Sequence, residues 1–209
     1  MTHDEQAARV FVVDDDDAIR DSISLLLETV DIPCVAFSTA TDFLDKFDPN
    51  AKGCLVLDIR MPKMSGLELQ AHLREIDCKL PVVFITGHGD IPMAVEAMRS
   101  GAINFIRKPF SEQELLDCVN EALDVETNQR IHHQDVQAMR AKIEKLTPRE
   151  LEVFERVSSG QANKVIAIEL GISERTVEIH RGQVMHKTES RSLPELVRLK
   201  LLRDQEASA

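Results

Sequence analysis

Five residues on four separated stretches of the first 108 positions carry side chains that suit phosphoryl chemistry: Asp14, Asp15, Asp58, Thr86 and Lys108. Ionised carboxylates that lie close together repel each other, so a cluster that stays ionised needs a cation. Oxygen ligands of this kind suit Mg²⁺ or Mn²⁺. A carboxylate can attack a phosphoryl group and form an aspartyl phosphate, while a metal ion and a lysine neutralise the transferring oxygens. The residue types therefore predict phosphoryl transfer to a carboxylate.

Such a site requires a fold that brings these positions together. Five short, mostly apolar runs alternate with helical patterns, which is typical of a parallel α/β sheet. The runs are residues 9–13, 34–37, 54–57, 81–86 and 103–107. The first, third and fourth runs are almost wholly apolar, as expected for strands covered on both faces. We therefore expect a doubly wound α/β fold with a five-stranded parallel sheet.

All five positions lie where a predicted strand ends. Asp14 and Asp15 follow the first strand, Asp58 follows the third, Thr86 ends the fourth and Lys108 comes just after the fifth. Ligands of open parallel sheets bind outside the carboxyl ends of the strands. Any one of these aspartates could merely cap the next helix, which is all that we expect of Asp16 and Asp17. The joint pattern favours a single shared site.

From Thr147 onward the sequence predicts helices only. Thr147, Pro148 and Glu150 form a capping box with proline at the first helical position. Four helices are expected to begin near residues 147, 163, 173 and 192, and Gly171 separates the second from the third. A helix, a short turn and a second helix can insert the later helix into the DNA major groove. We therefore expect a small all-α, four-helix domain with a helix-turn-helix.

The third of these helices has two different faces. Val177, His180, Val184 and Lys187 recur at helical spacing and are expected to face the core, with the charged end of Lys187 extending to solvent. The opposite face, which would meet base edges, carries Arg175, Glu178, Ile179 and Gly182. Phosphate contacts are expected at Lys164, Arg181 and Lys187. A plain four-helix bundle with a solvated charged face would show the same periodicity, because this part of the chain is not net basic.

Residues 125–146 connect the two parts and contain neither proline nor glycine. Val136, Met139, Ile143 and Leu146 recur there at alternating spacings of three and four, which predicts a short helical seam. The seam could pack on its own domain or pair with a second subunit. A pattern of two heptads does not distinguish these alternatives.

Charge is distributed unevenly along the chain. The last 63 residues hold ten acidic and ten basic side chains, so the net charge of −11 lies in the first 146 residues. An acidic part suits a cation or a basic partner, and a neutral part meets polyphosphate with less repulsion.

Four cysteines without C-x-x-C spacing and the lack of a bilayer-length apolar stretch indicate a reduced, cytoplasmic protein without membrane contact.

The segments at the strand ends resemble the receiver domain of two-component response regulators. The resemblance rests on Val12-Val13-Asp14-Asp15, Leu57-Asp58-Ile59-Arg60-Met61-Pro62, Phe84-Ile85-Thr86-Gly87-His88-Gly89 and Lys108-Pro109-Phe110, and it covers residues 9–123. It implies that Asp58 accepts a phosphoryl group from a histidine kinase, while Asp14, Asp15, Asp58 itself and the Arg60 carbonyl support Mg²⁺. It also implies the strand order 2-1-3-4-5, a cis Lys108–Pro109 bond, and a rearrangement of Thr86 and Phe105 on phosphorylation. We assign no chemistry to His88.

The second part resembles the LuxR-type output domain of the NarL/FixJ regulators over residues 146–202. The residues that carry this resemblance are Leu146-Thr147-Pro148-Arg149-Glu150, Asn163-Lys164 and Thr176-Val177-Glu178-Ile179-His180-Arg181. Two positions depart from the family pattern: Val165 stands where an acidic residue is usual, and Thr188 where an apolar residue is usual. The departure at Thr188 bears on the packing after the recognition helix.

The sequence thus predicts a receiver domain at residues 1–124, a helical linker at 125–146 and a LuxR-type DNA-binding domain at 147–209. In this interpretation phosphorylation of Asp58 controls sequence-specific DNA binding and transcription. A homodimer that forms on phosphorylation couples the receiver domain to the DNA-binding domain. The expected partners are a sensor histidine kinase, double-stranded promoter DNA and RNA polymerase.

Two other functions use parts of the same pattern. A Mg²⁺-dependent phosphohydrolase would also form an aspartyl phosphate, but its nucleophile usually follows the first strand in an Asp-x-Asp motif. Here the lone strand-end aspartate follows the third strand, so we expect no enzyme activity beyond slow autodephosphorylation. A receiver whose helical tail binds protein would show no salt-dependent affinity for DNA.

Overall fold

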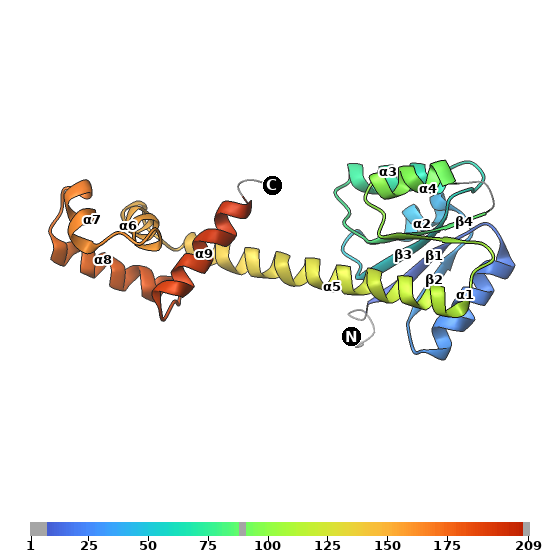
Figure 1. Ribbon diagram of the computed structural model, residues 1–209, viewed down its shortest axis with the longest axis horizontal. Coiled ribbons are helices and arrows are strands. Elements are labelled where there is room, and N and C mark those ends of the chain that lie inside the picture. Colours follow the sequence, from blue (N-terminus) through green and yellow to red (C-terminus); the bar gives the residue numbers. More distant parts are fainter. Residues whose placement is uncertain (1–7, 88–90, 207–209) are drawn as a thin grey trace. The chain divides into compact units, whose positions relative to one another are not determined.

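A computed structural model describes residues 8–87 and 91–206 of the chain (Figure 1). The chain divides into two compact units, and the division falls between Gln129 and Arg130. These two residues lie inside one helix, α5 (Glu112–Ile143). Each unit has a hydrophobic core of its own.

The first unit is built on five parallel strands in the order β2-β1-β3-β4-β5. The strands are β1 (Arg9–Val13), β2 (Cys34–Phe37), β3 (Gly53–Asp58), β4 (Val82–Thr86) and β5 (Asn104–Arg107). Every residue of β3 and β4 is buried, because both strands lie inside the sheet and both sheet faces are covered. The predicted fold class and strand order are confirmed, and each predicted strand differs from the observed one by one residue at most at either end.

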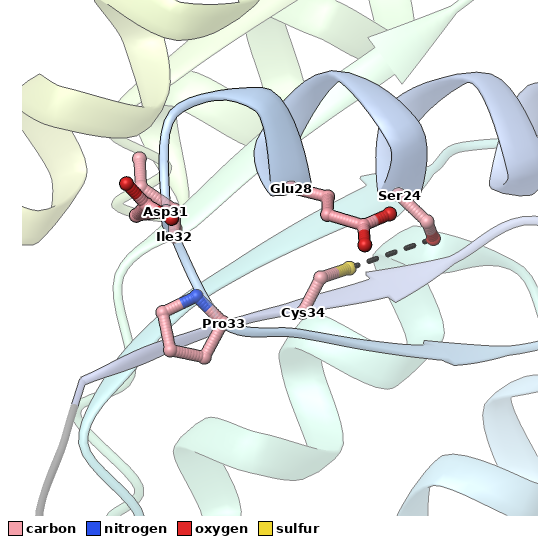
Figure 2. A pocket seen from close by; sticks show the side chains of 6 residues that line it. All are labelled: Ser24, Glu28, Asp31, Ile32, Pro33 and Cys34. Atoms are coloured by element: carbon pink, nitrogen blue, oxygen red, sulfur yellow. Dashed lines mark hydrogen bonds between the residues drawn. The ribbon is translucent and has the colours of Figure 1, made fainter.

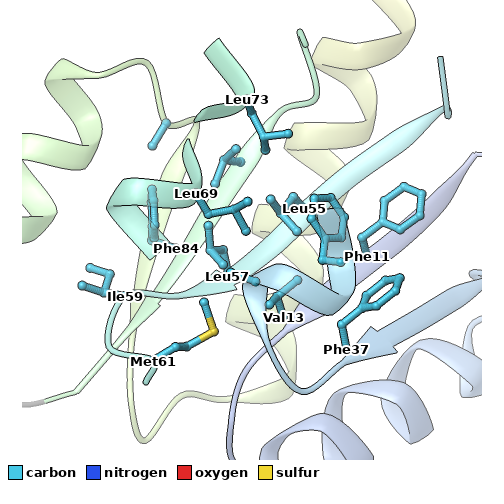
Figure 3. Packing of buried hydrophobic residues seen from close by; sticks show 14 of the residues in the cluster. Phe11, Val13, Phe37, Leu55, Leu57, Ile59, Met61, Leu69, Leu73 and Phe84 are labelled. Carbon is cyan, nitrogen blue, oxygen red and sulfur yellow. The ribbon is translucent and has the colours of Figure 1, made fainter. Parts of the chain in front are cut away.

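Helices cover both faces of this sheet (Figure 1). On one face α1 (Asp17–Thr29) and α5 pack against alternate strand residues such as Val10 and Val12. On the other face lie α2 (Ala40–Lys46), α3 (Gly66–Glu75) and α4 (Ile91–Arg99). There Phe11, Leu55 and Leu57 meet Leu69 and Leu73 of α3 (Figure 3). Alternate residues of one strand thus serve two cores, because successive side chains of a strand point to opposite faces.

The second unit contains four further helices, α6 (Pro148–Ser158), α7 (Asn163–Leu170), α8 (Glu174–Lys187) and α9 (Leu193–Glu206). The capping box predicted at the start of α6 is present, with reciprocal hydrogen bonds between Thr147 and Glu150. Gly171 ends α7 in the left-handed conformation, at φ 66°, which a residue without a Cβ adopts at little cost. Phe154, Ile166 and Val177 lie in the core of this unit.

Helix α5 joins the last helix of the sheet domain to the predicted linker without a break. The predicted seam is therefore part of a 32-residue helix and not a separate element. Val136 and Met139 are 7% and 2% exposed in the single chain, and Ile143 and Leu146 pack against the core of the second unit. Within the single chain the seam is already covered, which favours packing in the same chain over pairing with a second subunit.

No helix within residues 8–87 and 91–206 has the length and apolar character needed to cross a membrane.

Candidate functional site

The predicted acidic site lies at the carboxyl edge of the sheet. Asp14 directly follows β1, and Asp58 ends β3, the strand next to β1. The register pairs Asp58 with Ile85, one residue before Thr86 at the end of β4, and pairs Thr86 with Arg107, one residue before Lys108. Segments far apart in the sequence therefore end beside one another, because parallel strands present the same end at one edge.

Lys108 joins the two buried carboxylates of the site. Its Nζ donates to Asp14 Oδ2 and to Asp58 Oδ1, each at 2.7 Å. The Asp14 and Asp58 side chains are 1% and 8% exposed, whereas that of Lys108 is 24% exposed. One cation therefore lies between two carboxylates that water hardly reaches.

Burial and ion pairing act in opposite directions on these groups. Burial raises the pKa of the Asp58 carboxyl above its usual value, and the hydrogen bond from Lys108 offsets only part of this effect. Burial by itself lowers the pKa of Lys108, but the hydrogen bonds to Asp14 and Asp58 outweigh it and raise that pKa. Lys108 is therefore charged at neutral pH, and ionised Asp58 lies in a site that disfavours its negative charge.

The remaining oxygens of the two carboxylates accept hydrogen bonds from backbone amides. The Arg60 N–H donates to Asp58 Oδ2 at 2.7 Å, and the Asp16 N–H donates to Asp14 Oδ1 at 2.9 Å. These bonds fix both side chains before any ligand binds. Pre-organised groups of this kind lose little freedom when a cation or a phosphoryl group arrives.

The acidic run after β1 is held by a residue that the sequence did not single out, Arg20 of α1. Arg20 Nη1 donates to the Asp14 carbonyl at 2.7 Å, and Nη2 pairs with the Asp17 carboxylate. The spacing of three residues between Asp17 and Arg20 on one helix was the available signal. Asp16 caps α1 by accepting from the Ala18 N–H at 2.9 Å, as expected for it.

Gly66 at the start of α3 was also missed. A Cβ at this position would lie 2.2 Å from the Asp58 carbonyl oxygen and 3.0 Å from the Phe84 ring. The Gly66 N–H donates to the Ile59 carbonyl at 3.0 Å, so that α3 begins directly against the end of β3. No local pattern signals such a close approach, because the two backbones meet only after folding.

The other predicted receiver positions have different environments. Asp15 is exposed, Thr86 is buried with its hydroxyl 3.4 Å from the Gly87 carbonyl oxygen, and Phe105 on β5 is 44% exposed. Phe105 is therefore not an ordinary core residue. The predicted cis bond at Lys108–Pro109 is confirmed. His88 and Gly89 lie outside the described residues.

The donor set at this edge fits a hard divalent cation. Asp14 and Asp58 each place a carboxylate oxygen 2.7 Å from one ammonium group, which indicates that both can approach a common cation. Asp15 adds an exposed carboxylate beside them. The described residues contain no set of three His, Cys, Asp or Glu side chains already arranged around one metal position. A Mg²⁺ ion at this site would therefore need water molecules among its ligands, and Mg²⁺ usually keeps several waters when it binds to proteins.

The predicted DNA-reading face of α8 is exposed in the second unit. Arg175, Glu178, Ile179 and Gly182 are exposed, whereas Val177 and Val184 are buried on the opposite side of the helix. Ile179 is 57% exposed, and a Cβ at Gly182 would meet no atom within 4 Å. The face is therefore open to a large partner.

The predicted phosphate contacts fall into two groups. Lys164 at the start of α7 is exposed. Arg181 Nη1 instead donates to Asn163 Oδ1 at 2.7 Å, and Lys187 Nζ donates to Glu150 Oε2 at 2.6 Å.

Thr188, where the family has an apolar residue, is buried, and its hydroxyl donates to the Val184 carbonyl at 2.7 Å. The polar atom at this core position thus has a partner.

A hollow away from the acidic site lies between α1 and the start of β2 (Figure 2). It is lined by Ser24, Glu28, Asp31, Ile32, Pro33 and Cys34. Ser24 Oγ and Cys34 Sγ are 3.7 Å apart, and burial raises the pKa of the Cys34 thiol. Cys34 opens its strand, so this hollow is at the amino edge of the sheet and shares no residue with the acidic site.

An acidic, lysine-bridged site on a parallel sheet and a helix-turn-helix in a second unit together define a two-domain regulator. Comparison with known families gives the same division. Residues 10–120 match the response regulator receiver domain, and residues 144–200 match the bacterial regulatory proteins of the luxR family.

Individual relatives match nearly the whole chain. Nodulation protein W of Bradyrhizobium diazoefficiens is 45% identical over 92% of this chain and 85% of its own length. The response regulator protein TodT of Pseudomonas putida is 42% identical over 93% of this chain and 86% of its own length. The solved structure of the response regulator StyR is 45% identical, with a TM-score of 0.83 over 92% of this chain and 98% of that one. The chain belongs to the response regulators of the NarL/FixJ family.

Proposed function

We propose that Asp58 accepts a phosphoryl group from a sensor histidine kinase in the presence of Mg²⁺, and that this modification controls DNA binding by α8. The observation that carries the proposal is the pair of 2.7 Å hydrogen bonds through which Lys108 holds Asp14 and Asp58 together. A nucleophilic carboxylate, a neighbouring carboxylate for a metal ion and a fixed cation are the groups that phosphoryl transfer requires.

Each residue of the site has a distinct task in this proposal. Asp58 supplies the attacking oxygen, and Lys108 holds positive charge where phosphoryl oxygens arrive. Asp14, Asp15, Asp58 and the Arg60 carbonyl would hold Mg²⁺, which would neutralise charge on the phosphoryl oxygens. Thr86 then hydrogen-bonds the new phosphate, and the exposed Phe105 moves in response.

Phosphorylation with a small donor tests the receiver part of the proposal. Acetyl phosphate with Mg²⁺ is expected to label the wild-type chain, and Asp58→Asn is expected to abolish the label. Asp16→Asn serves as a matched control, because asparagine caps a helix as well as aspartate does and the variant should be labelled normally. Labelling of Asp58→Asn at the wild-type level would disprove the assignment, and chelation of Mg²⁺ should stop labelling of every variant.

The output part of the proposal assigns base contacts to Arg175, Glu178, Ile179 and Gly182, and a phosphate contact to Lys164. The exposure of all five residues supports it. Glu178→Ala is expected to change the sequences selected from a random pool of duplexes, whereas Lys164→Ala should weaken binding to all sequences alike. Unchanged sequence selection by Glu178→Ala would contradict the assigned face.

The two parts are coupled in this proposal by a homodimer that forms on phosphorylation. DNA half-sites are commonly bound by symmetric pairs, so dimerisation raises affinity without altering the reading helix. Sedimentation is expected to show a larger fraction of dimer after treatment with acetyl phosphate, and no such change for Asp58→Asn.

On promoter DNA the dimer is proposed to contact RNA polymerase. Catalytic turnover of small phosphoesters is expected only at the slow rate of autodephosphorylation.

A further inference from the structure

The end of the recognition helix α8 is attached to the start of α6 by one partly buried ion pair. Lys187 in the last turn of α8 donates to Glu150 Oε2 at 2.6 Å, and the same oxygen accepts from the Thr147 N–H at 2.7 Å. The Glu150 side chain is only 7% exposed, whereas that of Lys187 is 28% exposed. A single carboxylate thus closes the capping box of α6 and also binds the end of α8.

Glu150 is ionised in this environment. Burial by itself raises the pKa of Glu150, but the hydrogen bonds from Lys187 and Thr147 outweigh it and lower that pKa below its usual value. Moving Lys187 away to a DNA phosphate would therefore leave a buried carboxylate without its counter-charge. Removing one partner of a buried pair is strongly unfavourable, and an exposed cation such as Lys164 meets phosphate without this loss.

Other contacts hold the same end of α8. Thr188, its C-cap residue, is buried and donates its hydroxyl to the Val184 carbonyl. Glu189, the next residue, pairs with Lys142 at 3.2 Å and with Lys145 at 3.7 Å. The exposed reading face, by contrast, begins in the first turn of the helix at Arg175 and ends at Gly182, before its last turn. Recognition helices commonly contact base edges with their N-terminal residues, so α8 is anchored at one end and free to read at the other.

We propose that Lys187 is a positioning residue which acts through Glu150 to set the orientation of α8, and that it makes no contact with DNA phosphate. This inference rests on the proposed function of α8 as the DNA-reading helix. It revises the role expected for Lys187 from the sequence, and it adds Glu150, at the first turn of α6, to the residues on which sequence recognition depends.

The salt dependence of DNA binding distinguishes a positioning residue from a phosphate contact. Each phosphate contact contributes about 0.9 to the slope of log affinity against log salt concentration on duplex DNA. Lys187→Met keeps the apolar stem of the side chain, and Glu150→Gln keeps a side chain that can close a capping box while removing the charge. We would measure the binding of these variants to two kinds of DNA over a range of salt concentrations. One is the duplex that the wild type selects from a random pool, and the other is mixed-sequence duplex DNA.

Both variants are expected to bind the selected duplex about tenfold more weakly, a change of about 1.4 kcal/mol. Their salt slope should equal that of the wild type. The ratio of their affinity for the selected duplex to their affinity for mixed-sequence DNA should be smaller than in the wild type. The double variant should be no weaker than either single variant, because the two residues act as one unit. Lys187→Arg should recover part of the affinity. Two controls accompany them: Lys164→Ala should lower the slope by about 0.9, and Glu144→Ala, which breaks only the exposed ion pair with Arg140, should bind as the wild type does.

The opposite pattern would overturn the inference. If Lys187→Met lowers the slope as Lys164→Ala does, while Glu150→Gln binds normally, then Lys187 contacts phosphate directly. Melting curves for each variant show that binding is measured on folded protein.

A second readout does not depend on DNA. Amide resonances of residues 175–182 in the full chain without DNA are expected to shift alike in Lys187→Met and Glu150→Gln. Resonances that move only beside the substituted residues would refute the positioning role. A wild-type chain that binds no duplex even at low salt would disprove the proposed function, and the amide shifts would still decide whether Lys187 and Glu150 orient the helix.

Discussion

Burial and ion pairing act on the Asp58 carboxyl in opposite directions, and burial is the larger effect. The folded-state pKa is raised, so the ionised form of Asp58 lowers the stability of the folded chain at neutral pH. This penalty begins to shrink as the pH falls through the raised pKa, and it disappears below the ordinary pKa of an aspartate, where the carboxyl is neutral in both the folded and the unfolded states. The site therefore holds a negative charge at a cost in stability, which is common for groups used in chemistry.

Asp58→Asn is accordingly expected to raise the melting temperature of the first unit by a few degrees at neutral pH. The gain should shrink toward zero as the pH is lowered below the usual range of carboxyl pKa values. Lys108 keeps Asp14 as a partner in this variant, so its charge stays paired. Thermal melts at a series of pH values without Mg²⁺ measure the difference, and a variant that is less stable than the wild type at neutral pH would contradict it.

Gly66 shows how closely the site is packed. Gly66→Ala would place a methyl group 2.2 Å from the Asp58 carbonyl oxygen, so α3 or the end of β3 must move. We expect a loss of about 1–3 kcal/mol in the free energy of unfolding, measured with urea, together with slower labelling by acetyl phosphate. Gly182→Ala is the matched control for stability, since a Cβ there meets no neighbour within 4 Å and alanine favours the helix. Equal stabilities of the two variants would argue against the close approach.

At the scale of elements, α5 serves two different units along its length. Its first turns place Leu115 and Val119 in the core under the sheet, and its last turn places Ile143 against the core of the second unit. Val136 and Met139, between these ends, are buried, whereas Ile131 is 50% exposed. The segment is polar overall, but it carries a narrow apolar stripe that other residues of the same chain bury.

Met139→Ala is expected to lower the free energy of unfolding by about 2–5 kcal/mol, because it leaves a cavity at a buried position. The matched change Ile131→Ala, on the same helix but exposed, should alter it by less than about 0.5 kcal/mol. Urea unfolding at two protein concentrations measures both. A loss for Met139→Ala that depends on protein concentration would show that a second subunit covers the seam.

At the scale of the whole molecule, the two units differ in surface charge and in the ligands proposed for them. The acidic excess lies in the first 146 residues, with the carboxylates proposed to bind a metal ion, and the remainder is neutral overall. Each unit has a separate core, so a ligand of one unit stabilises that unit through its own binding free energy.

Mg²⁺ is therefore expected to raise the melting transition of the first unit and to leave that of the second unchanged. At a Mg²⁺ concentration of about 100 times its dissociation constant the added stability is about 2.7 kcal/mol. Calorimetry with and without a chelator measures it, and Asp15→Asn should reduce the shift. An equal shift of both transitions, or none, would contradict a metal site confined to the sheet domain.

Local patterns in the sequence determined the elements of both units. Apolar runs predicted the five strands because a strand covered on two faces must be apolar throughout. The capping box at Thr147 and the glycine at residue 171 predicted helix ends because these signals act over a few residues. Strand ends at one edge also predicted that Asp14, Asp58 and Lys108 would meet, and their mutual hydrogen bonds confirm this.

Only the tertiary structure decided which side chains bind each other over longer separations. Lys187 at the end of a helix has the same local pattern whether it contacts phosphate or Glu150, and 37 residues separate it from Glu150. The contact of Arg20 with the Asp14 carbonyl, the approach of Gly66 to Asp58 and the cover over Met139 likewise depend on how elements pack. The physical reason is that helix and strand signals are local, whereas burial and pairing of a charge depend on neighbours that only folding brings together.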